Sequence, residues 1–356
     1  MTTELKKPVN LAKAAKETAF YIFVIGILFI LLLPIYFVIS LSFLSTREAY
    51  QYPLPLVPEL ITKFTLTHGK RGYLISVYDS FEGEYQTVLD TKEIEKMQVY
   101  FKSQLSTYMS QEQITEYITR LEAGEDPVYF TGRKNLLHNY NTFFKVTRDA
   151  VPALIRSLQI CALTVLISLT IGGMAGYAFA RYIFKGRNAL KFSVLFVRMF
   201  PGVAIAIPMV VILVRMGFYD KPFGLALVYS VGAIALTVWI TASIFMSIPV
   251  SLEEAAQVFG ATKLRTFIRI TLPLAFPGLA AAAMYAFLGA WNETVAAIIL
   301  TQFNPTFSVV VYQSLLGSVG QVNLAAAGGI AMALPAVIFT FFIRRYIRQM
   351  WGGVTV

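Results

Sequence analysis

Six long apolar runs restrict this chain to the class of proteins built from membrane-spanning helices. A helix needs about 20 predominantly apolar residues to cross the hydrocarbon core of a bilayer. Only 14% of the residues are charged, whereas a soluble domain averages roughly 25%. The expected fold is therefore all-α and polytopic, with six transmembrane helices. The runs occupy residues 20–43, 151–182, 192–216, 223–246, 272–300 and 323–343.

The net charge of +10 is distributed in a way that indicates orientation in a membrane rather than binding of nucleic acid. Residues 47–149 hold 12 basic and 14 acidic residues, so the rest of the chain holds 18 and 6. Most of this basic excess lies in short segments beside the apolar runs, which is the pattern of cytoplasmic loops. We expect a multi-pass protein of the cell (inner or plasma) membrane with both termini in the cytoplasm.

The second apolar run carries three closely spaced glycines, Gly172, Gly173 and Gly176. Small residues let the backbones of neighbouring helices approach closely inside a bilayer. We therefore expect this face of the run to pack tightly against another span.

Residues 45–150 have the composition of a soluble domain and separate the first span, within 1–44, from the core at 151–356. Two segments rich in β-branched and aromatic residues, 72–80 and 84–89, predict strands around a turn. The tail before the first span is basic, so the positive-inside rule places this insert outside the cytoplasm. It either stiffens the complex or docks a partner.

Two helices are expected in the same insert, at 91–106 and 110–123. Each follows a pair of residues with the spacing of a helix cap. The pairs are Asp90 with Glu93, and Ser110 with Gln113. The insert is therefore predicted to be a small α+β domain.

The most informative polar segment of the core is 249–269, between the fourth and fifth apolar runs. Ser251 and Glu254 have the spacing of a capping box that starts a helix, and Gly260 is a natural stop. Thr262 is placed to cap a second helix. The first helix is too short to span a bilayer and carries an apolar stripe at helical spacing, so it suits docking into another protein. The stripe consists of Leu252, Ala255, Ala256 and Phe259.

The run Glu254-Ala255-Ala256, followed by Gly260 and by an Ile-x-Leu-Pro sequence ending at Pro273, resembles the EAA loop of ABC-importer permeases. The resemblance implies a type I importer core, MetI-like, in which this loop is the coupling helix gripped by an ABC ATPase dimer. The residues it assigns to ATPase coupling are Glu253, Glu254, Ala255, Ala256, Gly260, Lys263, Leu264 and Arg265.

The end of the chain extends the resemblance to the smaller permease of maltose-type carbohydrate importers. Its Gly-Gly-Val-Thr sequence is usual in that permease, where the tail reaches into the ATPase dimer; otherwise it is a free end. The residues are Gly352, Gly353, Val354 and Thr355. The implied substrate is maltose, maltodextrin or a related oligosaccharide, and the implied partners are a second permease, the ATPase dimer, an extracytoplasmic sugar-binding protein and the lipid bilayer. The departure from that permease is the large insert, since its first outer loop is much shorter.

Charged residues at membrane depth are costly, and they mark functional sites by default. Arg198 and Glu293 are the two candidates, and Trp291-Asn292-Glu293 resembles a run in the fifth span of the same family. These residues either line the translocation path as a gate or make hydrogen bonds between helices.

The outer segment 302–321 is apolar with amide and glycine residues interspersed. In the maltose-type relatives the equivalent loop enters the sugar cleft of the binding protein; the other interpretation is a re-entrant segment. The candidate contacts are Asn304, Pro305, Tyr312 and Gln313.

No catalytic or cofactor-binding motif is present in the sequence. It lacks the G-x-x-x-x-G-K-[ST] phosphate loop, and two histidines and one cysteine do not form a metal site. We expect a non-catalytic subunit without metal or cofactor, with ATP hydrolysed by the partner. The alternative is an ion-coupled secondary transporter, which needs intramembrane carboxylates, and Glu293 is the one clear example.

Overall fold

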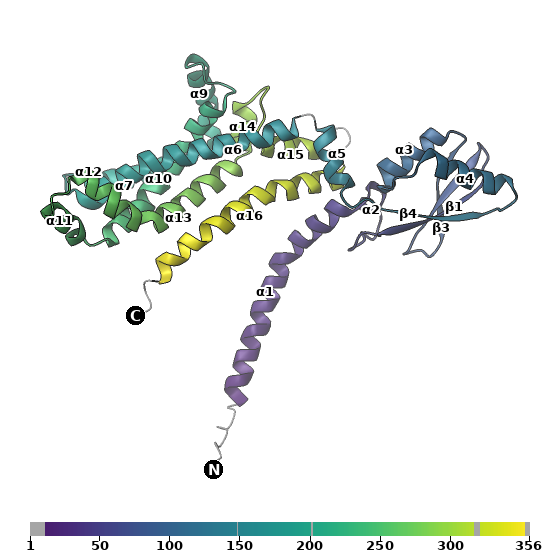
Figure 1. The fold of residues 1–356 in the computed structure, drawn as a ribbon, viewed down its shortest axis with the longest axis horizontal. Coiled ribbons are helices and arrows are strands. Elements are labelled where there is room, and N and C mark those ends of the chain that lie inside the picture. The colour runs from purple at the N-terminus through teal and green to yellow at the C-terminus, as the bar shows by residue number, and fades with distance from the viewer. Residues whose placement is uncertain (1–10, 148, 201, 317–320, 353–356) are drawn as a thin grey trace, which may run out of the picture. The chain divides into compact units, whose positions relative to one another are not determined.

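The computed structural model describes residues 11–147, 149–200, 202–316 and 321–352 (Figure 1). The chain divides into two compact units, one formed by Met1–Thr142 with Gln321–Ile330 and the other by Phe143–Gly320 with Ala331–Val356. Among the described residues, five helical stretches are long and apolar enough to cross a membrane.

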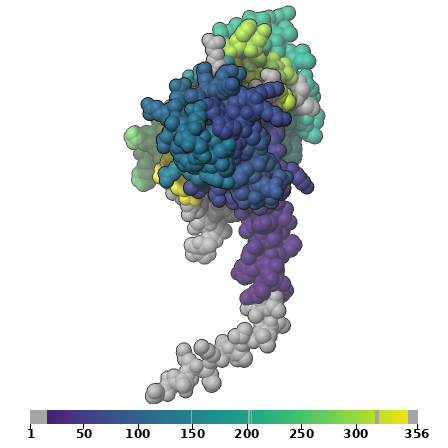
Figure 2. Space-filling view, turned by 90° about the vertical axis from the view of Figure 1, so that its right-hand side faces the viewer, coloured from purple at the N-terminus to yellow at the C-terminus, as the bar shows by residue number. Residues whose placement is uncertain are grey.

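The first unit begins with the expected first span, α1 (Leu11–Phe43), whose apolar side chains from Lys16 onward lie almost entirely on the surface. The insert that follows is a four-stranded antiparallel sheet with helices on one face, and Figure 2 shows it in blue as one continuous body. Its elements are α2 (Thr46–Ala49), β1 (Ile61–His68), β2 (Tyr73–Tyr78), β3 (Tyr85–Thr91), α3 (Ile94–Leu105), α4 (Gln111–Glu122), β4 (Val128–Arg133) and α5 (His138–Val146).

The sheet has the strand order β3-β2-β1-β4. Its core packs the sheet against α3 and α4 through Phe64, Phe101 and Phe130, whose ring centroids lie 5.1–6.2 Å apart. The two predicted strands are confirmed as β2 and β3, but β1 and β4 were not predicted. They pair with each other from Ile61↔Arg133 to Leu66↔Val128, so the chain enters and leaves the sheet on adjacent strands.

One of the two predicted helix caps in the insert is wrong. The Ser110–Gln113 capping box is present, with the Ser110 hydroxyl accepting from the Gln113 N–H at 3.2 Å. In contrast, α3 begins after Glu93 without a side-chain cap. Asp90 is used elsewhere, because its carboxylate oxygens accept the backbone N–H of Arg71 at 3.2 Å.

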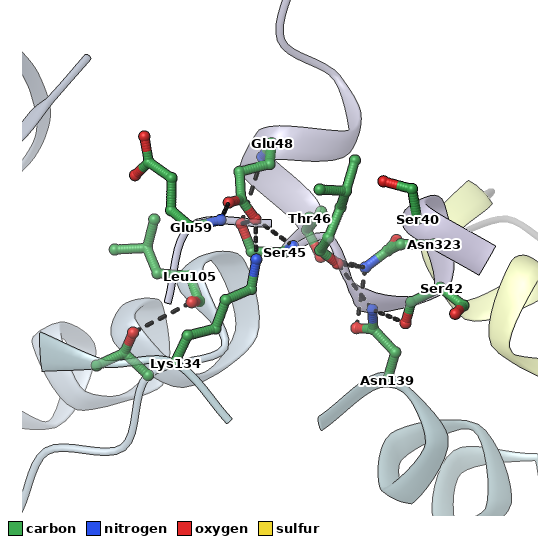
Figure 3. Close-up of polar contacts among 12 residues, drawn as sticks. Ser40, Ser42, Ser45, Thr46, Glu48, Glu59, Leu105, Lys134, Asn139 and Asn323 are labelled. Atoms are coloured by element: carbon green, nitrogen blue, oxygen red, sulfur yellow. Dashed lines mark hydrogen bonds and ion pairs between the residues drawn. The ribbon is translucent and has the colours of Figure 1, made fainter. Parts of the chain in front are cut away.

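A buried polar network joins the end of α1 to the insert and to the start of α16 (Val322–Gly352) (Figure 3). The Asn139 amide donates to the carbonyls of Ser42 and Leu44 at 2.8 and 2.7 Å. The Asn323 amide donates to the Asn139 side-chain oxygen at 3.1 Å, and Lys134 forms a buried ion pair with Glu48. These bonds satisfy polar groups that would be costly to bury unpaired.

The second unit is a helical bundle in which the continuous span formed by α6 and α7 lies beside α10 and α13 (Figure 1). The second and fourth spans are present as expected, and a π-helical segment interrupts the second. The elements are α6 (Ala150–Ile167), η1 (Ser168–Gly172), α7 (Gly173–Arg181), α8 (Arg187–Val197), α9 (Gly202–Arg215), α10 (Pro222–Ser247), α11 (Val250–Val258), α12 (Lys263–Thr266), η2 (Phe267–Thr271), α13 (Leu272–Trp291), α14 (Val295–Leu300) and α15 (Phe307–Leu316).

Three expectations for this unit need correction. The third apolar run, 192–216, does not form one helix. Its first part is the end of α8 and its second part is α9, and the sequence has a proline followed by a glycine between them. The fifth run, 272–300, is interrupted after Trp291. The outer segment expected as a loop contains α15.

Candidate coupling site

The polar segment between α10 and η2 folds as a short helix, a glycine turn and a second short helix. Gly260 has φ +86°, the left-handed conformation that a glycine stop requires, and the Thr262 side chain accepts from the Arg265 N–H at 3.3 Å. The predicted Ser251 capping box is wrong. Pro249 is the N-cap residue of α11, and its carbonyl accepts from the Leu252 N–H, so Ser251 already lies inside the first turn.

The apolar stripe of α11 faces outward. Leu252 and Ala255 are exposed, and Phe259 at the end of the helix is 91% exposed. Val258 and, in α12, Leu264 are also exposed. Exposed large apolar side chains on a short polar segment form a patch that is typical of protein contact sites.

The opposite face of α11 is fixed to the bundle by one buried carboxylate, Glu253. Its Oε1 accepts from Arg181 Nε at 2.8 Å and from the Thr271 hydroxyl at 2.9 Å. Its Oε2 accepts from the Tyr177 hydroxyl at 3.0 Å. Three neighbouring elements, α7, α11 and η2, therefore meet at a single side chain.

Arg181 extends this link to the end of α10. Its terminal nitrogens donate to the carbonyls of Phe245 and Ile248 at 2.7 and 3.1 Å. Arg181 and Glu253 are both buried, and their ion pair measures 2.8 Å. A buried pair with every partner satisfied is a stringent geometric requirement, because removing one member leaves an uncompensated charge.

The electrostatics of Glu253 favour its charged form. Burial alone would raise the pKa of this carboxyl, but the hydrogen bonds from Arg181, Thr271 and Tyr177 outweigh burial and lower the pKa below 4.5. Glu253 is therefore ionised at neutral pH and holds its three donors.

Sequence reasoning identified Glu253 within the coupling segment but missed its three partners. Arg181 is one of the basic residues beside the apolar runs and was not singled out. It lies 72 positions from Glu253 in the sequence, and no local pattern connects the two.

The charged residues expected at membrane depth come together at one cavity. Arg198, at the end of α8, and Glu293, between α13 and α14, both line a cavity of about 230 Å³ with Tyr229 and Tyr285. One oxygen of Glu293 accepts from the Ala296 N–H at 2.9 Å and so starts α14.

The two residues that precede Glu293 in the sequence differ in burial. The Trp291 indole is buried and donates to the Met332 carbonyl at 3.0 Å, whereas Asn292 is an exposed residue at the end of α13. Trp291 therefore belongs to the packing of α13 against α16.

The predicted outer contact segment is held by Asp220, a residue that sequence reasoning did not single out. The Asp220 carboxylate accepts the backbone N–H groups of Gln302, Phe303 and Asn304 at 3.1–3.2 Å, and the Asn304 side-chain amide at 2.9 Å. Phe303 is nevertheless 77% exposed. The turn before α10 and the segment after α14 are thus tied by one side chain.

A second bond fixes the next residue of this segment, because Arg156 donates to the Pro305 carbonyl at 2.6 Å. Tyr312 and Gln313 lie further on, both exposed on α15. Of the tail residues, Gly352 ends α16, while Gly353, Val354 and Thr355 lie outside the described residues.

Replacing Asp220 by alanine should release the backbone of residues 302–304. Each hydrogen bond to a charged group contributes about 1.5–3 kcal/mol, so amide exchange in this segment should accelerate at least ~10-fold. Hydrogen–deuterium exchange of the peptide covering 301–306 measures this. Lys221→Ala is the control, because the Lys221 ammonium donates to the Gly217 carbonyl at the preceding turn. Equal exchange in the two variants would show that Asp220 does not hold the segment.

Comparison with known proteins gives consistent matches for the bundle. Residues 168–351 match a protein family described as "Binding-protein-dependent transport system inner membrane component". A "Trehalose transport system permease protein SugB" of Mycobacterium tuberculosis is 34% identical over 212 residues, which cover 56% of this chain and 75% of that protein. A "Trehalose/maltose transport system permease protein MalG" of Thermococcus litoralis is 29% identical over 232 residues, 63% of this chain and 83% of that protein.

A similar architecture occurs in the crystal structure of a bacterial ABC transporter involved in the import of the acidic polysaccharide alginate. The superposition has a TM-score of 0.55 and covers 97% of this chain and 99% of that chain, at 18% sequence identity. This likeness concerns the fold alone.

Proposed function

Because the chain belongs to the binding-protein-dependent transport system inner membrane component family, we propose that it is a permease subunit of an ATP-driven importer for a carbohydrate. The observation that carries the proposal is the short helix α11, whose apolar side chains face outward while Glu253 fixes it to α7 and η2. A helix of this kind passes an external force to the bundle. The family favours the importer over an ion-coupled transporter.

The carbohydrate class is supported by the names of the relatives, which include permeases for trehalose and for trehalose with maltose. A maltodextrin permease of Bacillus subtilis, 32% identical over 203 residues, adds to this group. The proposed substrate is a sugar of this kind, such as maltose, maltodextrin or a related oligosaccharide.

The mechanism uses ATP that is bound and hydrolysed by a partner. An ABC ATPase dimer receives the exposed side of α11, and its closure pulls on this helix. The Glu253–Arg181 pair transmits the displacement to α7 and to the end of α10, where Arg181 holds two carbonyls. The bundle then switches between inward- and outward-facing states together with a second permease.

The sugar arrives on an extracytoplasmic binding protein, in keeping with the family description. We assign its contact to the outer segment with Asn304, Pro305, Tyr312 and Gln313, and a gate to the cavity with Arg198 and Glu293. The tail from Gly352 to Thr355 reaches the ATPase. The division into 1–44, 45–150 and 151–356, with both termini in the cytoplasm, is supported by the distribution of basic residues.

Replacing Phe259 by aspartate should detach the ATPase from the permease. Burying a phenylalanine side chain contributes about 1.5–3 kcal/mol, so the ATPase retained on the affinity-purified permease should fall ~10-fold or more. The assay is co-purification of the assembled complex from membranes, quantified by mass spectrometry.

Phe303→Asp is the matched control, since Phe303 is also exposed but lies in the outer segment. It should retain the ATPase and lose stimulation of ATP hydrolysis by the binding protein. If Phe259→Asp keeps its full complement of ATPase, α11 is not the ATPase contact and the proposed function is wrong.

A further inference from the structure

The link between α1 and the insert contains an apolar, proline-rich segment that we call the proline loop, residues 52–58. Its sequence is Tyr-Pro-Leu-Pro-Leu-Val-Pro, without a charged residue. All four of its non-proline side chains are exposed, and Val57 is 67% exposed. They are Tyr52, Leu54, Leu56 and Val57.

The proline loop runs back along the membrane-spanning helix. The carbonyl of Leu56 accepts from the Tyr36 hydroxyl at 2.8 Å and from the Ser40 hydroxyl at 2.6 Å. Tyr36 lies seven residues before Phe43, the end of α1. Ser40 lies three residues before that end, so at 1.5 Å rise per residue the loop reaches back about 5–10 Å along the helix.

Both ends of the proline loop are tied to the insert. The Gln51 amide donates to the Asp79 carboxylate at 2.6 Å, and the Glu59 N–H donates to the Glu48 carboxylate at 3.0 Å. The middle of the loop is bound to α1 and its ends to the insert, so its position beside α1 is set by six residues outside it. All of these contacts lie within the first unit.

The composition of the loop suits an apolar surrounding. Three of its seven residues are prolines, which carry no backbone N–H. An unpaired backbone donor costs several kcal/mol in hydrocarbon, so their absence lowers the cost of burial in lipid. The Leu56 carbonyl, which would also be costly there, has two hydroxyl donors.

The neighbouring surface of α1 identifies the partner. Val38 and Ile39 are exposed apolar residues on the turns between Tyr36 and Ser40, at the level where Leu56 is bound. This surface belongs to a candidate membrane span. The proline loop meets this span at Tyr36 and Ser40 and adds exposed apolar side chains at the same level of the helix.

We propose that the proline loop inserts into the lipid at the end of the first span and anchors the insert to the bilayer surface. The partner is the acyl and glycerol region of one leaflet, and Tyr52 marks the boundary between lipid and water, as tyrosines do in interfacial belts. The proposal depends on the chain spanning a membrane and not on what it transports.

The test places an environment-sensitive fluorophore on Val57→Cys in the full-length chain, reconstituted in phosphatidylcholine liposomes. Val99→Cys is the matched control, because Val99 is 59% exposed on α3 of the same insert. The native Cys161 is buried, and the chain without an added cysteine supplies the background. Quenching is measured with iodide on both sides of the membrane and with spin-labelled phosphatidylcholine.

We expect the label at position 57 to be quenched by the spin-labelled lipid and to be at least ~5-fold less sensitive to iodide than the label at 99. Equal iodide quenching at the two positions would overturn the proposal. Protection from iodide without quenching by the labelled lipid would also overturn it, because protein rather than lipid would then cover the loop. Leu54→Cys repeats the measurement should the Val57 variant fail to fold.

Discussion

Replacing Glu253 by alanine should disconnect transport from ATP hydrolysis while the complex still assembles. The change leaves Arg181 buried without its carboxylate, and breaking a buried ion pair costs about 3–5 kcal/mol. The α11 helix then loses its attachments to α7 and η2, whereas its exposed apolar side chains remain. Binding-protein-dependent sugar uptake in proteoliposomes should fall more than ~10-fold, with the ATPase still co-purifying.

The structural part of this expectation is measured independently by amide exchange across residues 250–258. It should accelerate in Glu253→Ala and remain unchanged in Glu254→Ala, because Glu254 is the exposed neighbour. Wild-type uptake by Glu253→Ala, with unchanged exchange in α11, would refute the transmission pathway through Glu253.

Lowering the pH is a second way to break the ion pair between Glu253 and Arg181, because acid protonates the Glu253 carboxylate. The folded-state pKa of Glu253 lies below the ordinary value of a glutamate, so the stabilisation from its ionised form is fully present above that ordinary value. It is lost as the pH falls through the lowered folded-state pKa. Exchange in α11 of the unmodified protein should therefore show no transition between pH 8 and 5 beyond the intrinsic pH dependence of exchange.

Replacing Gly176 by alanine should weaken the bundle by forcing two of its helices apart. The added Cβ would lie 1.9 Å from the Thr241 hydroxyl oxygen and 3.0 Å from the Ala242 backbone nitrogen, so α7 and α10 must separate. Overpacking of this kind costs about 1–3 kcal/mol, and we expect the melting temperature to fall by about 2–5 °C.

The measurement is thermal unfolding of the purified full-length chain in detergent, followed by size-exclusion chromatography. Gly329→Ala in α16 is the matched control, since a Cβ at position 329 meets no atom within 4 Å. It should leave the melting temperature unchanged or raise it slightly. Equal melting temperatures for the two variants would show that the contact between α7 and α10 tolerates expansion.

The close approach at Gly176 was predictable because small residues at helical spacing have a direct packing meaning. Gly172 follows the same rule, since its Cβ would meet Thr237 at 2.9 Å, whereas Gly173 has only an ordinary contact of 3.7 Å with Leu279. Apolar length predicted α1 and α10 for an equally direct reason. In both cases the information lies within one segment.

The features that sequence reasoning missed depend on partners distant in the chain. Strand β4 is an edge of the sheet and β1 is its neighbour. Their pairing closes a loop of more than sixty residues. The Asp90 carboxylate had the spacing of a cap but binds the Arg71 N–H instead. A local sequence pattern predicts which hydrogen bonds a residue can make. Which of these bonds forms depends on the residues that the fold brings close to it.

The candidate site also contains some features that a local pattern predicts and others that depend on distant residues. The spacing of Glu254, Ala255, Ala256 and Gly260 was sufficient to identify the short helix and its stop. The direction of the helix was not predictable, because it depends on Glu253 meeting Arg181 and Thr271. Likewise, Arg198 and Glu293 were chosen for the cost of burying charge, and only the packing of α10 with α8 and with α13 places them at one cavity.

Because β1 pairs with β4, the two ends of the chain segment that forms the sheet lie next to each other. Ile61 and Arg133 are partners on adjacent strands, and the Lys134 N–H donates to the Leu60 carbonyl at 3.1 Å. Cα atoms of paired antiparallel residues lie only about 5 Å apart, so the ends left by excising the sheet are already within reach of a tight turn. The segment between Ile61 and Arg133 could therefore be replaced by a short turn without stretching the polypeptide on either side.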